Sequence, residues 1–450
     1  MKTRLKEESV ILVSVVKWIV LATIVGIIVG LSTTMFVSSL NWGAVLVNQY
    51  PLYFLLMPAG FLLSAIIIKY IFPAAEGHGG NSVIEAIHKR SGKIQAIAVP
   101  VEFLRTFVTL TSGGSAGKEG PSAQIGAGLA SIFADFLRFE GADRRKLVIC
   151  GISGGFASVF GTPLAGAIFG MEVLLVGSIR YDVLLPSFVA GIISYQVSSW
   201  LGLTYFYHPI TFVPVFSEAF FVKVIIAGVF FGIASFIFVE VLRLGKKVSS
   251  NLKIPLELKA VLGGLLLVGI TYAAGREYLG LGLDTIQAAL EGKDVPWHAF
   301  LLKSVFTSVT LSFGGHGGIG TPIFYVGATA GSLLSKIINV DPAMLSAIGF
   351  VSLLAGAANT PIAASIMAIE LFGPEIAPYA AVSCVISFVI TGHRSAYPSQ
   401  ILAVKKSSSL DVSLGDELGN LNPEYRQREK SLLGAVRHLW ELTGKVKNKK

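Results

Sequence analysis

Long apolar stretches, separated by short polar segments, run through most of the chain. The first extends from about residue 10 to 37, which is enough for a bilayer crossing of about 20 residues. Further apolar stretches lie at residues 50–72, 147–176, 183–201, 219–242, 260–274, 299–313, 343–358 and 376–390. This pattern predicts an all-α polytopic membrane protein with the lipid bilayer as its main solvent.

Glycine and proline interrupt many of these stretches, as at residues 156–163 and 313–322. An unpaired backbone group that faces lipid costs several kcal/mol, so interrupted helices persist only where protein encloses them. With 49 Gly and 18 Pro, the chain therefore has the pattern of a transporter or channel rather than of a simple helical bundle.

Composition agrees with a membrane protein. Hydrophobic residues make up 53% of the chain and charged residues 14%, and the mean hydropathy is +0.70. Soluble domains carry about 25% charged residues. These values exclude a cytosolic enzyme, a secreted disulfide module and a disordered chain. Cys150 and Cys384 both lie in apolar stretches, which indicates neither a disulfide framework nor a metal site. We expect no cofactor.

The net charge of +9 is best explained by cationic cytosolic loops under the positive-inside rule. Basic residues gather at 88–93, 138–146 and 243–253 and beyond residue 402. We therefore expect no nucleic-acid partner, a multi-pass protein of the cell (inner) membrane, and both termini in the cytosol. The first apolar stretch is too long for a cleaved signal peptide.

The chain contains an internal repeat. Gly113–Pro121 matches Gly314–Pro322 at an offset of 201 residues, and Thr162–Ala165 matches Thr360–Ala363 at an offset of 198. Two matches in the same order at nearly one offset predict a duplicated architecture.

The repeat also sets the expected domain boundaries. We expect a transport domain over residues 1–403, with halves at about 10–206 and 218–400. Residues 404–450 should form a basic cytosolic tail with one short helix near 430–444. This tail is too short for a pair of regulatory nucleotide-binding domains.

Duplicated membrane halves usually hold their substrate between them, on helices that begin or end inside the membrane. Pro121 and Pro322 suit such helix starts, because proline is favoured at the first helical position. Two helix N-termini that face each other would bind an anion through free N–H groups and the helix dipoles. The alternative is that the neighbouring glycines only permit close helix packing.

Four ordered motifs resemble those of one known family. Residues 117–126 read GKEGPSAQIG, residues 318–322 read GIGTP, residues 162–166 read TPLAG, and Tyr397 follows the last apolar stretch. They resemble the G-[KR]-E-G-P-x-x-Q-I-G, G-I-F-x-P and A-P-L-A-G…E motifs and the pore tyrosine of CLC chloride channels and proton/chloride exchangers. The resemblance implies two inverted halves of tilted and re-entrant helices. It also implies a homodimer with a pore in each subunit.

Glu119 corresponds to the gating glutamate of that family. Its carboxylate would occupy an anion position when the pore is closed, and Lys118 and Gly120 flank it. A carboxylate beside helix N-termini imitates the permeating anion, and protonation would neutralise it and release the site. An intramembrane carboxylate is functional by default.

The resemblance also implies an anion site for chloride or another small monovalent anion. The Tyr397 hydroxyl and the backbone amides of Ile319 and Gly320 would bind the ion. Gly320 departs from the family, because a phenylalanine usually stands there. His78, followed by Gly79, takes the place of the usual serine. It could donate a hydrogen bond to the anion or be an ordinary loop histidine.

Position 173 bears on mechanism. Exchangers of the family often carry an inner proton-transfer glutamate there, whereas this chain has Val173. We therefore expect passive, channel-like conduction gated by Glu119. The alternative is a proton-coupled chloride antiporter, with Glu172 as a candidate group in the proton path. Glu172 and Glu370 occupy duplicate positions, which favours structural contacts for both. A fluoride-selective branch typically lacks the proline that Pro121 retains, which disfavours fluoride.

An enzyme is the most distant alternative. Residues 113–117 fit G-x-S-x-G around Ser115, and His316 lies in the matching segment. An intramembrane serine hydrolase would need these two side chains hydrogen-bonded to each other. The soluble α/β pattern around a hydrolase nucleophile is missing from the sequence, so we expect no enzymatic activity.

Overall fold

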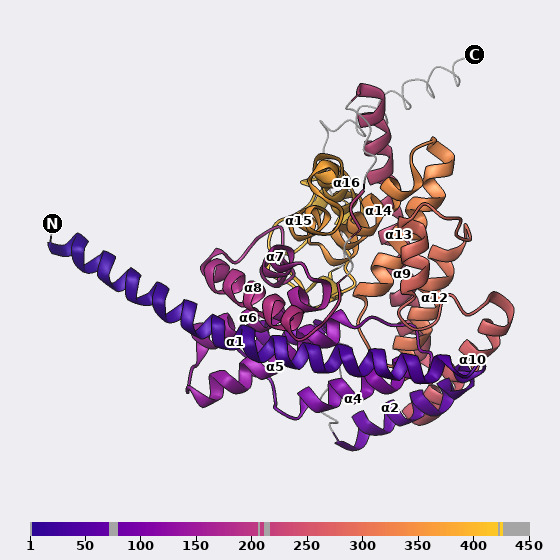
Figure 1. Ribbon diagram of the computed structural model, residues 1–450, viewed down its shortest axis with the longest axis horizontal. Coiled ribbons are helices and arrows are strands. Elements are labelled where there is room, and N and C mark those ends of the chain that lie inside the picture. The colour runs from indigo at the N-terminus through magenta and orange to yellow at the C-terminus, as the bar shows by residue number, and fades with distance from the viewer. Residues whose placement is uncertain (1, 72–79, 206–207, 211–216, 422–423, 426–450) are drawn as a thin grey trace, which may run out of the picture.

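Sixteen α-helices form the body of the protein (Figure 1), and the computed structural model describes residues 2–71, 80–205, 208–210, 217–421 and 424–425. The first eight are α1 (Lys2–Asn48), α2 (Met57–Ile71), α3 (Gly80–Lys89), α4 (Ala98–Thr111), α5 (Glu119–Phe136), α6 (Gly141–Phe160), α7 (Pro163–Glu172) and α8 (Leu184–Trp200). The second eight are α9 (Glu218–Asn251), α10 (Leu256–Ala274), α11 (Leu283–Leu290), α12 (Ala299–Ser312), α13 (Gly320–Ile338), α14 (Pro342–Ala358), α15 (Pro361–Phe372) and α16 (Ala377–Ile390).

The helices divide into two sets of eight in matching order, which confirms the predicted all-α fold class. Among the described residues, five helical segments are long and apolar enough to cross a membrane. The longest, α1 and α9, occupy equivalent places in the two halves, and α1 projects beyond the other helices at its N-terminal end (Figure 1). Shorter helices such as α7 and α15 end inside the protein body, as expected for re-entrant segments.

Glycine and proline set the helix ends near the centre. The apolar stretch at 147–176 forms two helices, because Gly161 adopts a left-handed conformation (φ 72°) that ends α6. Pro163 then begins α7. The prediction that Pro121 and Pro322 occupy the first helical position is wrong by two residues. Helices α5 and α13 begin at Glu119 and Gly320, so each proline is the third residue of its helix.

Close helix packing depends on glycines at equivalent crossings. A Cβ added at Gly126 of α5 would lie 2.5 Å from the carbonyl oxygen of Gly151 in α6. In the second half, a Cβ at Gly327 of α13 would lie 2.3 Å from the carbonyl oxygen of Gly349 in α14. Both are far below van der Waals contact with backbone. The alternative role predicted for glycine, close packing, is therefore real at these positions.

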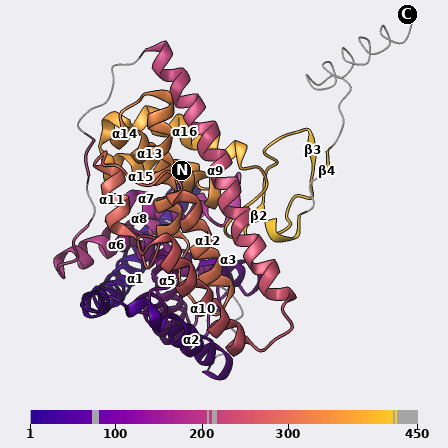
Figure 2. The same ribbon diagram turned by 90° about the vertical axis from the view of Figure 1, so that its right-hand side faces the viewer.

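Residues 398–421, here called the C-terminal strap, extend to the side of the helices, at the right of Figure 2. Strand β2 (Ile401–Leu402) of the strap pairs in parallel with β1 (Leu175–Val176). Strand β3 (Leu410–Asp411) of the strap pairs antiparallel with β4 (Glu424–Tyr425), which follows the strap. Leu402 and Leu418 are buried against Val176. The folded part of the chain thus continues beyond residue 403, the expected boundary. The helix expected near residues 430–444 lies outside the described residues.

Short 3-10 helices complete the described secondary structure, at Tyr53–Leu56, Tyr181–Val183, Pro374–Ile376 and Leu418–Asn420.

Candidate anion-transport site

The two Gly-rich segments meet at the centre of the protein. The amide of Gly117 donates to the carbonyl of Gly318 at 2.6 Å, and the amide of Gly318 donates to the carbonyl of Gly117 at 2.8 Å. This bridge brings the N-termini of α5 and α13 together. The sequence repeat predicts this meeting of helix ends.

Each Gly-rich segment is also held by the opposite half. The Ser115 amide donates to the Thr310 hydroxyl of α12 at 3.0 Å, and the His316 amide donates to the Thr109 hydroxyl of α4 at 2.9 Å. These four residues form two equivalent contacts, because the offset of 201 residues relates Ser115 to His316 and Thr109 to Thr310. The helix N-termini are therefore fixed relative to each other.

The Glu119 side chain lies at the N-terminus of helix α13, which belongs to the second half of the chain. Its side chain is 2% exposed, and its Oε2 accepts from the Thr321 amide of α13 at 2.8 Å. The Thr321 hydroxyl donates to Oε1 of the same carboxylate. The first turn of a helix supplies unpaired N–H groups and the positive end of the dipole, so an anionic group is stabilised there. The Glu119 carboxylate occupies such a position.

The amide that binds this carboxylate belongs to Thr321, one residue beyond the predicted pair Ile319 and Gly320. Gly320 instead provides space. A Cβ at Gly320 would lie 2.9 Å from Glu119 Oε2 and 3.2 Å from Glu119 Cβ. The glutamate therefore packs directly over the glycine that replaces the family's phenylalanine. Ile319 is buried beside it, at the start of α13.

A small cavity of about 20 Å³ adjoins Glu119. It is lined by Glu119, Gly120, Tyr397 and Val173, together with apolar side chains that include Phe156. Val173, at the family's inner relay position, thus faces the same cavity as the gating glutamate. Lys118 is half-buried and directly precedes Glu119. His78 and Gly79, the remaining predicted anion ligands, lie outside the described residues.

A second cavity, here called the vestibule, opens from this centre and has a volume of about 790 Å³. Its lining includes Gly120, Gly318, Ile319 and Tyr397. Its charged lining is mixed with an excess of cations: Lys89, Arg105, Arg243, Lys246 and Arg394 against Glu85, Glu240 and Glu417. A positive excess along a narrowing cavity concentrates anions near the helix N-termini.

Gln400 holds the turn that carries Tyr397. Its Nε2 donates to the carbonyls of Val173 and Ala358, both at 2.8 Å, and its Oε1 accepts from the Ser395 hydroxyl at 2.6 Å. The same Ser395 oxygen accepts from the Tyr397 amide at 2.9 Å. Gln400 is fully buried. This one side chain therefore joins the end of α7, the end of α14 and the tyrosine turn.

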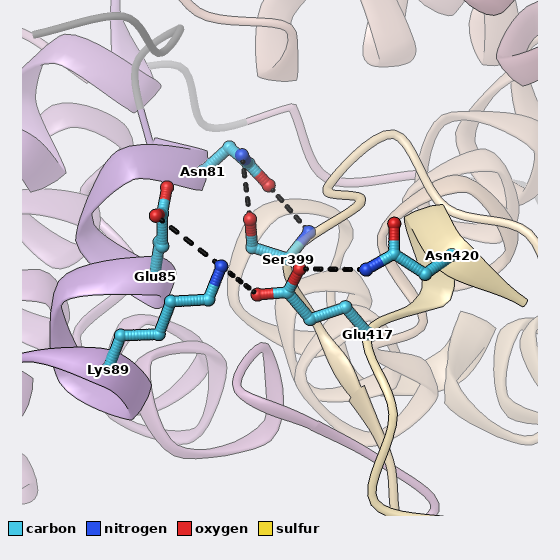
Figure 3. Close-up of polar contacts among 6 residues, drawn as sticks. All are labelled: Asn81, Glu85, Lys89, Ser399, Glu417 and Asn420. Atoms are coloured by element: carbon cyan, nitrogen blue, oxygen red, sulfur yellow. Dashed lines mark hydrogen bonds and ion pairs between the residues drawn. The ribbon is translucent and has the colours of Figure 1, made fainter. Parts of the chain in front are cut away.

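Polar contacts join helix α3 to the strap (Figure 3). Asn81 donates to the Ser399 hydroxyl at 3.0 Å and accepts from the Ser399 amide at 2.9 Å. Further along α3, Lys89 pairs with Glu417 of the strap at 2.9 Å. The start of α3 therefore lies against the tyrosine turn, and a Cβ at Gly80 would be 3.3 Å from the Tyr397 ring.

Glu172 binds a helix end rather than lining a path. Its two oxygens accept from the amides of Ile362 and Ala363, at 3.1 and 2.8 Å, at the N-terminus of α15. Glu370 does the same for α7, accepting from the amides of Leu164 and Ala165 at 2.9 and 2.8 Å. The two glutamates cap each other's helices, as their duplicate positions led us to expect.

Ser115 and His316 do not form a nucleophile–base pair. The Ser115 hydroxyl shares a hydrogen bond with Thr307 at 3.1 Å, whereas His316 Nε2 lies 2.7 Å from Oε2 of Glu102. The geometry that a serine hydrolase needs is thus missing from these two residues.

Comparison with known proteins agrees with the geometry. The model of the voltage-gated chloride channel family matches residues 59–392. A chloride/fluoride channel protein of Pseudomonas syringae pv. tomato is 37% identical over 408 residues, 89% of each chain. The chain belongs to the CLC family. An uncharacterised protein of Methanocaldococcus jannaschii is 27% identical, over 84% of this chain and 94% of its own.

Two solved CLC structures are similar in fold. A CLC-type fluoride/proton antiporter has a TM-score of 0.82 at 26% identity, over 86% of this chain and 98% of its own. A slow cyanobacterial Cl⁻/H⁺ antiporter has a TM-score of 0.70 at 21% identity, over 83% and 94%. CLC proteins are channels or transporters, so the expectation that this chain is no enzyme is confirmed, as is that of a multi-pass membrane protein.

Sequence reasoning missed three buried polar residues: Thr321 and Gln400, which contact the site, and Glu102, which contacts His316. Thr321 stands at a variable position of the GIGTP motif, and its hydroxyl becomes significant only once Glu119 is placed beside it. Gln400 lies at the end of the expected second half, and none of the four motifs includes it. Glu102 is an isolated acid in an apolar helix, and that was the one available signal, because an intramembrane acid is functional by default.

Proposed function

We propose that the protein exchanges a small halide, chloride or fluoride, for protons. The halide competes with the Glu119 carboxylate for its site, and the proton binds to that carboxylate. The observation that carries this proposal is the Glu119 carboxylate bound to the amide and hydroxyl of Thr321. A carboxylate in an anion position is displaced by a halide or released by a proton, so one site couples the two ions.

The comparisons support an antiporter better than the passive, channel-like conduction that Val173 led us to expect. The solved structure at 26% identity is described as a fluoride/proton antiporter. The Pseudomonas relative at 37% identity is described as a channel, so passive conduction is the competing outcome of the test below. Val173 removes one relay acid but leaves Glu119 itself in place.

Fluoride belongs among the candidate anions, although Pro121 had disfavoured it. Two relatives have fluoride in their descriptions. The site offers a hydroxyl and an amide from Thr321 and a hydroxyl from Tyr397. Hydrogen-bond donors of this kind suit a small, strongly hydrated anion, because they replace the water that it loses.

We further propose a homodimer with one pore in each subunit, in the cell membrane and with both termini in the cytosol. The family resemblance and the distribution of basic residues support this arrangement. Chloride or fluoride is the transported ion, and the proposal includes no other cofactor.

Purified protein in liposomes tests the exchange. An outward gradient of chloride or fluoride is imposed, and the internal pH is recorded while the membrane potential is clamped with valinomycin and K⁺. We expect protons to enter against their gradient, with the better anion giving the faster movement. Glu119→Gln should abolish the proton movement. Anion efflux without proton movement in the wild-type protein would establish the passive channel instead.

A further inference from the structure

A titratable group between the vestibule and Glu119 would carry protons to the gate during exchange. Val173 provides none, and both oxygens of Glu172 are engaged by the N-terminus of α15. Protonation of a carboxylate that caps a helix weakens these bonds, because hydrogen bonds to a charged group are stronger than those to a neutral one. A different pair of residues has the required chemistry.

Glu102 of α4 and His316 of the second Gly-rich segment form a buried acid–base pair. Their Oε2 and Nε2 atoms are 2.7 Å apart, and the side chains are 4% and 1% exposed. Of the ion pairs in the described part of the chain, it is the one with both partners buried. The second oxygen of Glu102, Oε1, has no hydrogen-bond donor among the described residues. This oxygen is a vacant acceptor beside an imidazole.

The pair lies directly behind the vestibule wall. Arg105, one helical turn after Glu102, lines the vestibule, and so do Gly314 and Gly317 on either side of His316. Gly317 is followed by Gly318, which bridges to Gly117. A Cβ at Gly117 would be 2.3 Å from Glu119 Oε2. The Glu102–His316 pair and the Glu119 side chain therefore both lie close to the backbone bridge between Gly117 and Gly318.

The equivalent positions of the other half hold no such pair. Lys303 stands in place of Glu102 and Ser115 in place of His316, at the offset of 201 residues. The Lys303 ammonium is fully buried and donates to the carbonyls of Tyr278 and Gly280 at 3.0 and 2.8 Å. The Ser115 hydroxyl contacts Thr307. The equivalent residues Lys303 and Ser115 thus have separate partners, and the direct contact between an acid and an imidazole is found in one half of the described chain.

We propose that Glu102 and His316 form a proton-binding site that exchanges protons between the vestibule and Glu119, in place of the relay acid that Val173 replaces. This inference rests on the proposed proton exchange and names the group that performs its inner step. Glu102 and His316 bind the proton. Arg105 is a positioning residue: its Nε donates to the carbonyl and the hydroxyl of Ser64, at 3.1 and 3.2 Å, which fixes its positive charge near the pair.

The proton balance is simple. The pair takes one proton from vestibule water and gains one positive charge. After a halide has displaced the Glu119 carboxylate, the same proton passes through water beside the Gly117–Gly318 bridge to that carboxylate. The pair then returns to its starting charge, and Glu119 becomes neutral. Proton movement in the other direction reverses these steps, and no other reactant is consumed.

Few charged groups face the pair. Arg105 is the cation that acts on the His316 ring, and Glu102 is the anion. Glu119 lies across the Gly-rich segments. On the helices packed against α4, Lys17, Lys69 and Asp135 form ion pairs with Asp143, Glu257 and Arg144, and Glu7 and Glu8 are exposed near the N-terminus of α1.

The test compares anion and proton fluxes in the same liposomes. In Glu102→Gln and in His316→Gln, we expect anion flux to persist and coupled proton flux to fall by about 100-fold, the lower end of what a positioned proton-transfer group contributes. Glu102→Asp should restore part of the proton flux, which a purely structural role would not predict. Ser115→Ala, the equivalent change in the other half, should keep wild-type coupling.

Wild-type coupling in either glutamine variant would overturn the inference while leaving the proposed function intact. If one variant does not fold, the other still decides. A direct measurement is the carboxylic-acid infrared band of Glu102, assigned by its loss in Glu102→Gln. A band that is insensitive to pH between 5 and 9 would also overturn the inference. Wild-type protein without any proton movement would instead refute the proposed function, and the two failures are therefore distinguishable.

Discussion

Glu119 of the first half binds the N-terminus of helix α13, in the second half, through the amide and the hydroxyl of Thr321. The gate is thus a contact between the two repeats, and its strength depends on the charge of one carboxylate. Neutralising that carboxylate weakens both bonds, because hydrogen bonds to charged groups are worth about 1.5–3 kcal/mol and neutral ones about 1 kcal/mol.

Glu119→Gln should therefore remove the pH dependence of anion flux. In the wild-type protein, anion flux should rise as pH falls, since protonation releases the side chain from Thr321. The amide of glutamine cannot be protonated in this range. Flux of the variant, measured with an anion electrode between pH 4 and 8, should be flat. A variant that keeps the wild-type pH profile would show that another group gates the pore.

Gly320→Ala should loosen the gate without unfolding the protein. The added Cβ would lie 2.9 Å from Glu119 Oε2, which is the end of a flexible side chain that can move away. We expect faster anion flux at neutral pH and a shallower pH profile. Gly327→Ala is the matched control, because its Cβ would meet the Gly349 carbonyl oxygen at 2.3 Å and should prevent folding. Unchanged flux in Gly320→Ala would mean that the carboxylate does not rest there.

Glu172→Gln should lower stability and leave proton coupling unchanged. It weakens the charge-assisted cap on α15, and we expect the free energy of unfolding to fall by about 1–3 kcal/mol. Glu370→Gln, the equivalent change at α7, should give a loss of similar size. Thermal unfolding in detergent measures both variants, and the liposome assay measures coupling. Loss of proton coupling in Glu172→Gln but not in Glu370→Gln would show that Glu172 belongs to the proton path.

Tyr397→Phe and Gln400→Leu distinguish the contribution of the tyrosine hydroxyl to halide binding from that of Gln400, which holds the tyrosine turn in place. Removing the hydroxyl should weaken halide binding by about 0.5–1.5 kcal/mol. Gln400→Leu keeps the hydroxyl but leaves the carbonyls of Val173 and Ala358 without their donor, so Tyr397 should lose its fixed position and halide affinity should fall as well. Isothermal calorimetry measures both affinities. Wild-type affinity in Tyr397→Phe would place its hydroxyl away from the ion.

Lys406 of the strap should make stability depend on pH. Its ammonium donates to Asn359 Oδ1 and to the Phe388 carbonyl, both at 2.6 Å. Burial lowers the pKa of Lys406 to about 7, against about 10.4 in an unfolded chain. Between these values the unfolded chain holds a proton that the folded chain has released, so the contribution of Lys406 to stability rises with pH. It is lowest below about pH 7.

The matched variant for this effect is Lys406→Met, which removes the titrating group. The melting temperature of the wild-type protein relative to Lys406→Met should increase from pH 7 to pH 9. A constant difference over this range would show that Lys406 titrates normally in the folded protein.

Much of the fold and the centre of the site could be predicted from the sequence. The repeat at offsets of 201 and 198 residues predicted that two Gly-rich helix starts meet, and it favoured structural contacts for Glu172 and Glu370. The family resemblance of the GKEGP motif led to Glu119. The side chains of Thr321 and Gln400 could not be predicted, because their partners are 202 and 227 residues away in Glu119 and Val173.

The strap shows a different limit of sequence reasoning. Residues 404–421 are polar enough to suggest a solvated tail, yet Leu418 is buried and Glu417 binds Lys89. Alternation of a few apolar side chains with charged ones is compatible with both a solvated tail and a segment packed against the helices. Only the parallel pairing of β2 with β1, which is non-local, decides between them.

The reversal potential of the purified protein in a lipid bilayer tests the exchange of halide for protons most directly. Halide concentrations are kept fixed on both sides, and a pH difference is imposed. We predict that the reversal potential shifts with the pH difference in the wild-type protein and follows the halide gradient alone in Glu119→Gln. A wild-type reversal potential that stays at the halide equilibrium value under every pH difference would contradict the account, since it would mean that no proton is exchanged.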